Sequence, residues 1–77
     1  MEIKILGSGC MNCKKLYANA EAAVGELGVS AQITKVEDFK EITKYGVMRT
    51  PAIVINEKVK AFGKISTVEE IKKFIQE

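Results

Sequence analysis

Apolar residues recur along this chain with two different periods, and the two periods predict strands and helices. Residues 2–6 and 29–36 are rich in β-branched side chains and partly alternate between apolar and polar, which predicts two strands. Between them, apolar residues at helical spacing over residues 10–27 predict an amphipathic helix with one buried face. Because a helix joins these two strands, we expect a right-handed βαβ unit with parallel pairing.

The second half of the chain has the pattern of a shorter helix, a hairpin and a final helix. Residues 39–45 and 67–76 are the predicted helices, and the latter carries acidic residues in its first turn. Residues 52–55 are wholly apolar, which is typical of a central buried strand. Residues 58–62 alternate, which predicts an antiparallel edge strand. Simple alternation places the two apolar residues of that edge strand on one side: Val59 and Ala61.

Composition and charge exclude several functional classes. The 77 residues predict a single domain, residues 1–77, with the ordinary globular balance of 47% hydrophobic and 29% charged residues. The 12 basic and 10 acidic residues are interleaved and give a net charge of +2, which is not the charge pattern of a nucleic-acid-binding protein. The first apolar run is too short for a signal peptide or a membrane span, so we expect a cytoplasmic protein that does not bind membranes.

The sequence Cys-Met-Asn-Cys at residues 10–13 contains both cysteines of the chain. In a reducing compartment such a pair is more often catalytic or metal-binding than structural. Cys10 falls where the first helix begins, and the unpaired N–H groups of a helix start lower the pKa of a thiol from its usual ~8.5. Cys13 comes one turn later and is expected to be less exposed. This asymmetry predicts that Cys10 attacks a disulfide and Cys13 resolves it.

The chain resembles the thioredoxin/glutaredoxin superfamily, and in particular the small archaeal and bacterial thioredoxin-like redox-active disulfide proteins. The resemblance covers nearly the whole chain and rests on three features. These are the cysteine pair at a strand-to-helix turn, the sequence Tyr-Gly-Val-Met-Arg-Thr-Pro at residues 45–51, and Gly63 before the last helix. It implies an α/β thioredoxin-like fold of order βαβαββα, in which a central four-stranded mixed sheet is flanked by three helices in three layers.

The resemblance also implies a function, namely thiol–disulfide oxidoreductase. Cys10 and Cys13 would be catalytic and would cycle through a disulfide and a mixed-disulfide intermediate. Thr50 and Pro51 would form a cis-proline loop that binds the substrate, with the Thr50 backbone pairing to an extended segment. The partners would be protein or low-molecular-weight disulfides and a thiol reductase, and the protein would be a monomer without a cofactor or a metal.

Several positions depart from the family pattern, and one other class of protein shares the cysteine spacing. Met11 and Asn12 replace Gly-Pro between the cysteines, and Lys4 occupies the position at which thioredoxins carry a buried acid. The alternative is a heavy-metal-associated domain or copper metallochaperone, in which two thiolates bind Cu(I). Those domains carry Met where this chain has Ser8, and their βαββαβ order ends in a strand. The predicted C-terminal helix and Thr50-Pro51 favour the redox function.

Overall fold

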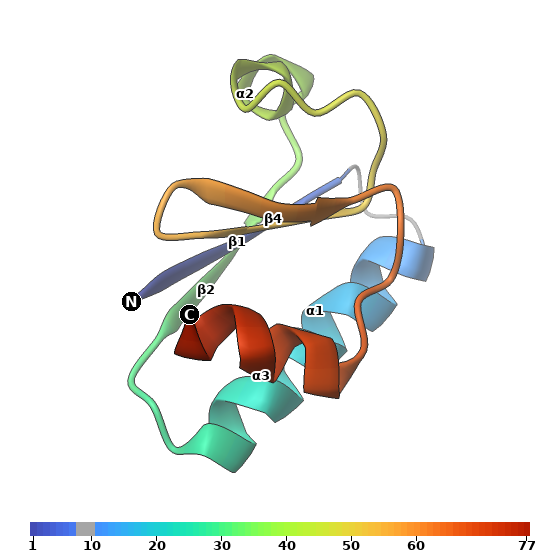
Figure 1. The fold of residues 1–77 in the computed structure, drawn as a ribbon. Coiled ribbons are helices and arrows are strands. Elements are labelled where there is room, and N and C mark those ends of the chain that lie inside the picture. Colours follow the sequence, from blue (N-terminus) through green and yellow to red (C-terminus); the bar gives the residue numbers. More distant parts are fainter. Residues whose placement is uncertain (8–10) are drawn as a thin grey trace.

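The computed structural model describes residues 1–7 and 11–77, and its elements follow the predicted order βαβαββα (Figure 1). Their bounds are β1 (Glu2–Leu6), α1 (Met11–Leu27), β2 (Gln32–Val36), α2 (Phe39–Lys44), β3 (Ala52–Ile55), β4 (Lys58–Phe62) and α3 (Val68–Gln76). The described chain ends in a helix, as predicted, so its order differs from the βαββαβ order of the metal-binding alternative.

The four strands form one mixed sheet in the order β2-β1-β3-β4. β1 pairs in parallel with β2 and antiparallel with β3, and β3 pairs antiparallel with β4. Helices α1 and α3 cover one face of this sheet and α2 covers the other (Figure 1). This arrangement confirms the predicted three-layer α/β fold.

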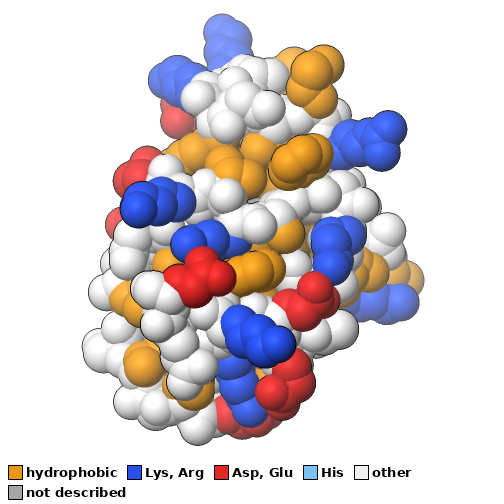
Figure 2. Space-filling model, in the orientation of Figure 1, with side chains coloured by type: hydrophobic (Ala, Val, Ile, Leu, Met, Phe, Trp, Pro, Cys, Tyr) orange, Lys and Arg blue, Asp and Glu red, His pale blue; other side chains and the backbone are white. Residues whose placement is uncertain are grey.

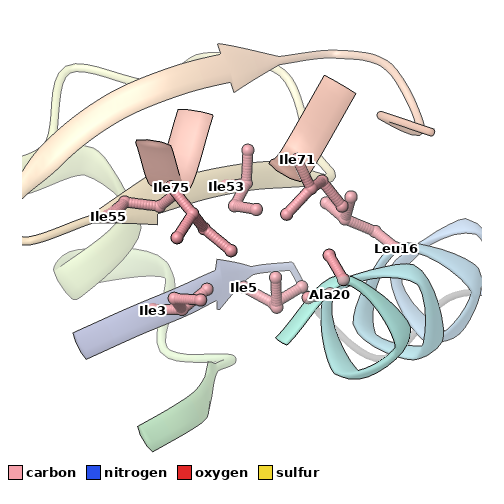
Figure 3. Packing of buried hydrophobic residues seen from close by; sticks show 9 residues of the cluster. Ile3, Ile5, Leu16, Ala20, Ile53, Ile55, Ile71 and Ile75 are labelled. Carbon is pink, nitrogen blue, oxygen red and sulfur yellow. The ribbon is translucent and has the colours of Figure 1, made fainter. Parts of the chain in front are cut away.

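Both faces of the sheet are buried, which explains the continuous apolar run of β3. Ile53 and Ile55 point toward α1 and α3, where they meet isoleucines of β1 and α3 (Figure 3). Ala52 and Val54 point the other way, into a smaller cluster under α2. A strand with only one buried face alternates apolar and polar residues. A central strand that is covered on both faces is apolar at every position.

The second strand is shorter than the sequence pattern predicts. β2 was expected over residues 29–36 but begins at Gln32, which is paired with Glu2 at the start of β1. The Gln32 N–H donates to the Met1 carbonyl at 3.0 Å. Residues 29–31 therefore lie beyond Glu2, the first residue of the strand that pairs with β2.

The prediction that Val59 and Ala61 face the same side was wrong. Ile53 pairs with Ala61 but Val54 pairs with Val59, so Lys60 is an additional residue in β4. Such a β-bulge shifts the alternation of side chains by one position. Val59 consequently packs into the cluster under α2, while Ala61 packs against the cluster on the opposite face.

A capping box begins α3, at the helix start that the sequence indicated. Thr67 is the N-cap: its hydroxyl accepts from the Glu70 N–H at 3.1 Å, and the Glu70 carboxylate accepts from the Thr67 N–H at 2.9 Å. Lys64 adds a hydrogen bond to the other oxygen of the same carboxylate at 2.7 Å. Reciprocal bonds of this kind satisfy the donors that a helix start leaves unpaired.

The capping carboxylate makes the stability of the fold depend on pH. The Lys64 ammonium and then the Thr67 N–H lower the pKa of Glu70 from 4.5 to about 2. Because the folded-state pKa is depressed, this contribution is complete above about pH 5 and is lost as pH falls toward 2. We expect the difference in unfolding free energy between the wild type and Glu70→Gln to shrink over that range in urea titrations. A difference that stays constant from pH 6 to pH 2 would contradict this assignment.

Candidate active site

The candidate site lies at the carboxyl end of β1, where Gly7 follows the last strand residue. Gly7 is buried, and its N–H donates to the Val36 carbonyl at 2.9 Å, which joins it to the end of β2. Helix α1 begins shortly afterwards at Met11. Cys10, the predicted nucleophile, lies outside the described residues, although it directly precedes the first residue of that helix in sequence.

Gly7 brings the predicted resolving cysteine and the predicted substrate loop together. Cys13 lies in the first turn of α1 and is buried, with 7% of its surface exposed. A Cβ atom on Gly7 would overlap the Cys13 Sγ and would lie 3.7 Å from the Thr50 Cβ. The three residues come from the end of β1, from α1 and from the loop before β3, and no local pattern in the sequence indicates this close approach at Gly7.

The loop that contains Thr50 and Pro51 is also bonded to the segment after β4. The Thr50–Pro51 peptide bond is cis, as the family resemblance implied, with Thr50 exposed and Pro51 buried. The Pro51 carbonyl accepts from the Gly63 N–H at 2.9 Å. Gly63 has a φ of +70°, which favours glycine, and the Arg49 side chain lies directly over it, with its Cβ 3.2 Å from where a Gly63 Cβ would be. The loop is therefore tied to the segment that precedes α3.

A pocket of about 200 Å³ lies beside Cys13. Its walls carry two lysines and one carboxylate in addition to the thiol and apolar groups. The described residues that line it are Ile5, Gly7, Cys13, Lys14, Lys35 and Glu37. The pocket gives solvent a route to a cysteine that is otherwise covered.

A second hollow, of about 290 Å³, lies on the other side of Glu37 and runs along the Thr50 loop; we call it the α2 groove. It is lined by Glu37, Phe39, Ile42, Thr43, Val47, Met48 and Thr50. Phe39 is 76% exposed and Met48 is 94% exposed, and Figure 2 shows apolar side chains at the surface between α2 and the sheet. Concave surfaces rimmed by large exposed apolar side chains are typical of binding sites. The sequence did not single out either residue, because exposure follows from the fold.

Lys4 is held away from Cys13, on the face of β1 that α2 covers. Its ammonium donates to the Glu57 carboxylate at 2.7 Å and to the Tyr45 hydroxyl at 2.8 Å, and that hydroxyl donates to Glu57 at 3.0 Å. The hydrogen bond to Glu57, followed by that to Tyr45, raises the pKa of Lys4. The ring ties β1 to the C-cap of α2, so Lys4 has a structural role and no access to the Cys13 pocket.

Across residues 1–7 and 11–77, no group of three or more His, Cys, Asp or Glu side chains is arranged to hold a metal ion. None of the helices in this described part of the chain has the length and apolar character needed to cross a bilayer.

Comparison with known proteins identifies the family. The sequence model of the thioredoxin domain matches residues 1–76. A thioredoxin from Methanothermobacter thermautotrophicus is 37% identical over 75 residues, which cover 97% of this chain and 97% of that protein. A thioredoxin from Methanocaldococcus jannaschii is 44% identical over 70 residues, which cover 91% of this chain and 80% of that protein. The chain therefore belongs to the thioredoxin family of thiol–disulfide oxidoreductases.

Proposed function

We propose that Cys10 and Cys13 are the redox pair and that they act in sequence. The Cys10 thiolate attacks a client disulfide, and one client sulfur leaves as a thiolate while the other stays bonded to Cys10. Cys13 then attacks Cys10, which forms the internal disulfide and releases the second client thiol. The observation that carries this proposal is the placement of Cys13, buried one turn into α1 and packed against Gly7 beside Thr50.

We further propose that Thr50 and Pro51 bind the client and that the α2 groove determines which clients are preferred. The exposed Thr50 backbone would pair with an extended client segment, as in strand addition. The apolar rim formed by Phe39 and Met48 would then receive a large apolar side chain next to the client cysteine. Extended protein segments with apolar residues near the disulfide are the substrate class that fits this surface, and small disulfides would use the Thr50 loop alone.

The remaining partners follow from the same chemistry. Thioredoxins act on protein disulfides and are themselves reduced by a reductase. We propose that this chain works as a monomeric cytoplasmic domain, residues 1–77, with a dedicated thiol reductase as its electron donor. The cycle needs neither a metal nor an organic cofactor, because the two cysteines carry both electrons.

A redox titration of the cysteine pair tests the proposed function. We expect a single two-electron transition against glutathione or dithiothreitol buffers, with a midpoint between about −120 and −300 mV. Mass spectrometry should show loss of two hydrogens in the oxidised form, and Cys10→Ser should show no such internal disulfide. Absence of the transition, together with retention of Cu(I) against a competing chelator, would favour the metal-binding alternative.

A further inference from the structure

We propose that Glu37 accepts the proton of Cys13, through water in the pocket that the two side chains share, when Cys13 resolves the mixed disulfide. This inference rests on the proposed function. The resolving step needs a thiolate, because a thiol is a poor nucleophile. Cys13 is buried, so its proton must leave through the pocket beside it.

The backbone fixes Glu37 at the edge of this pocket. Val36 ends β2, pairs with Leu6 and accepts the Gly7 N–H at 2.9 Å, so the next residue is held beside the end of β1. Glu37 and Cys13 both line the pocket, whose volume of about 200 Å³ holds several water molecules. A proton can therefore move from the sulfur to the carboxylate along a short water path, without contact between the two side chains.

Among the described residues that line the pocket, Glu37 carries the carboxylate. Lys14 from α1 and Lys35 from β2 also line it, and apart from the cysteine the other described lining residues, Ile5 and Gly7, carry no titratable group. An ammonium group has donors but no acceptor, so the two lysines stabilise negative charge and take up no proton. The family resemblance implied that Lys4 stands where thioredoxins carry a buried acid, but Lys4 lies in its hydrogen-bonded ring on the other face of β1.

The α2 groove adds a second reason to assign this role to Glu37. Glu37 lines both the Cys13 pocket and the groove that reaches Thr50. A client in the groove would cover the carboxylate from bulk solvent at the moment when the mixed disulfide exists, and electrostatic interactions strengthen as water is excluded. The departing client thiolate then takes up one proton, which the Glu37 carboxylic acid supplies through the same water. The step therefore consumes and releases one proton, and two electrons pass from the cysteines to the client.

A single-turnover reaction with 4,4′-dithiodipyridine separates the two steps, since each releases one thiopyridone chromophore. We expect Glu37→Gln to leave the first phase unchanged and to slow the second by about tenfold or more near pH 7, within the usual range of general-base catalysis. The ratio of wild-type to variant rates should fall toward one as pH approaches about 8.5, the ordinary pKa of a thiol. Glu37→Asp, which keeps the carboxylate, should recover part of the rate.

The direction of the effect distinguishes proton transfer from simple electrostatics. Removing a negative charge beside Cys13 favours its thiolate, so an electrostatic role alone predicts a faster second phase in Glu37→Gln. Glu41→Gln, which changes an exposed carboxylate on α2 outside both hollows, should match the wild type. An unchanged or faster second phase in Glu37→Gln overturns the proposal. If the wild type itself forms no internal disulfide by mass, the proposed function fails instead.

Discussion

Replacing Cys13 with serine is expected to trap the protein on its client, whereas replacing Cys10 is expected to abolish attachment. We expect Cys10 to start the exchange, because it directly precedes α1 in sequence and the unpaired N–H groups of a helix start stabilise a nearby thiolate. Without Cys13 the mixed disulfide cannot be resolved from within the protein. Non-reducing gels and intact mass after addition of a disulfide-containing protein should show a stable one-to-one adduct for Cys13→Ser and none for Cys10→Ser.

The wild type and an alkylation experiment provide the controls. Wild-type protein should accumulate no adduct and should end as the internal disulfide. In the reduced wild type, iodoacetamide should modify Cys10 much faster than Cys13 near neutral pH, because Cys13 is only 7% exposed and packs against Gly7. Equal, slow alkylation of both thiols, or an adduct formed through Cys13 in Cys10→Ser, would contradict the assignment of Cys10 as the attacking cysteine.

The element order could be predicted from the sequence because the apolar periods match the burial in the fold. β3 shows this most clearly, since its residues are apolar at every position and both faces of the sheet are buried there. The predictions were wrong where the bounds or the register of a strand depend on the strand beside it. β2 begins only where β1 offers a partner at Glu2, and the bulge at Lys60 arises from the pairing of β3 with β4. A local period contains no information about either register.

The candidate site shows the same division between local and long-range signals. Two cysteines at residues 10 and 13 are visible as a motif, and the following proline segment is visible by resemblance. Glu37 and Met48 are ordinary residues in sequence, and only the fold places one between two hollows and leaves the other almost fully exposed. From the sequence, Gly7 is predicted only to end the first strand, whereas the structure places the Cys13 sulfur in close contact with it.

Gly7→Ala is expected to be the most disruptive single-methyl change in this site. The added Cβ would overlap the Cys13 Sγ and lie 3.3 Å from the Cys13 Cβ, in a place where both residues are buried. Either the end of β1 or the first turn of α1 must shift, and overpacking of this kind costs about 1–3 kcal/mol. For a domain of this size we expect the Tm of the reduced protein to fall by roughly 5–15 °C.

Gly25→Ala is the matched control, because it makes the same chemical change in open space. Gly25 is exposed within α1, and an added Cβ there would meet nothing within 4 Å. Glycine is a poor residue in a helix interior, so this variant should be more stable by about 0.5–1 kcal/mol in urea titrations. Repeating Gly7→Ala in a Cys13→Ala background removes the sulfur, and the cost of the methyl group should then shrink. If that cost is unchanged, or if Gly7→Ala is as stable as the wild type, then the sulfur does not restrict this position and the close packing assigned to the site is wrong.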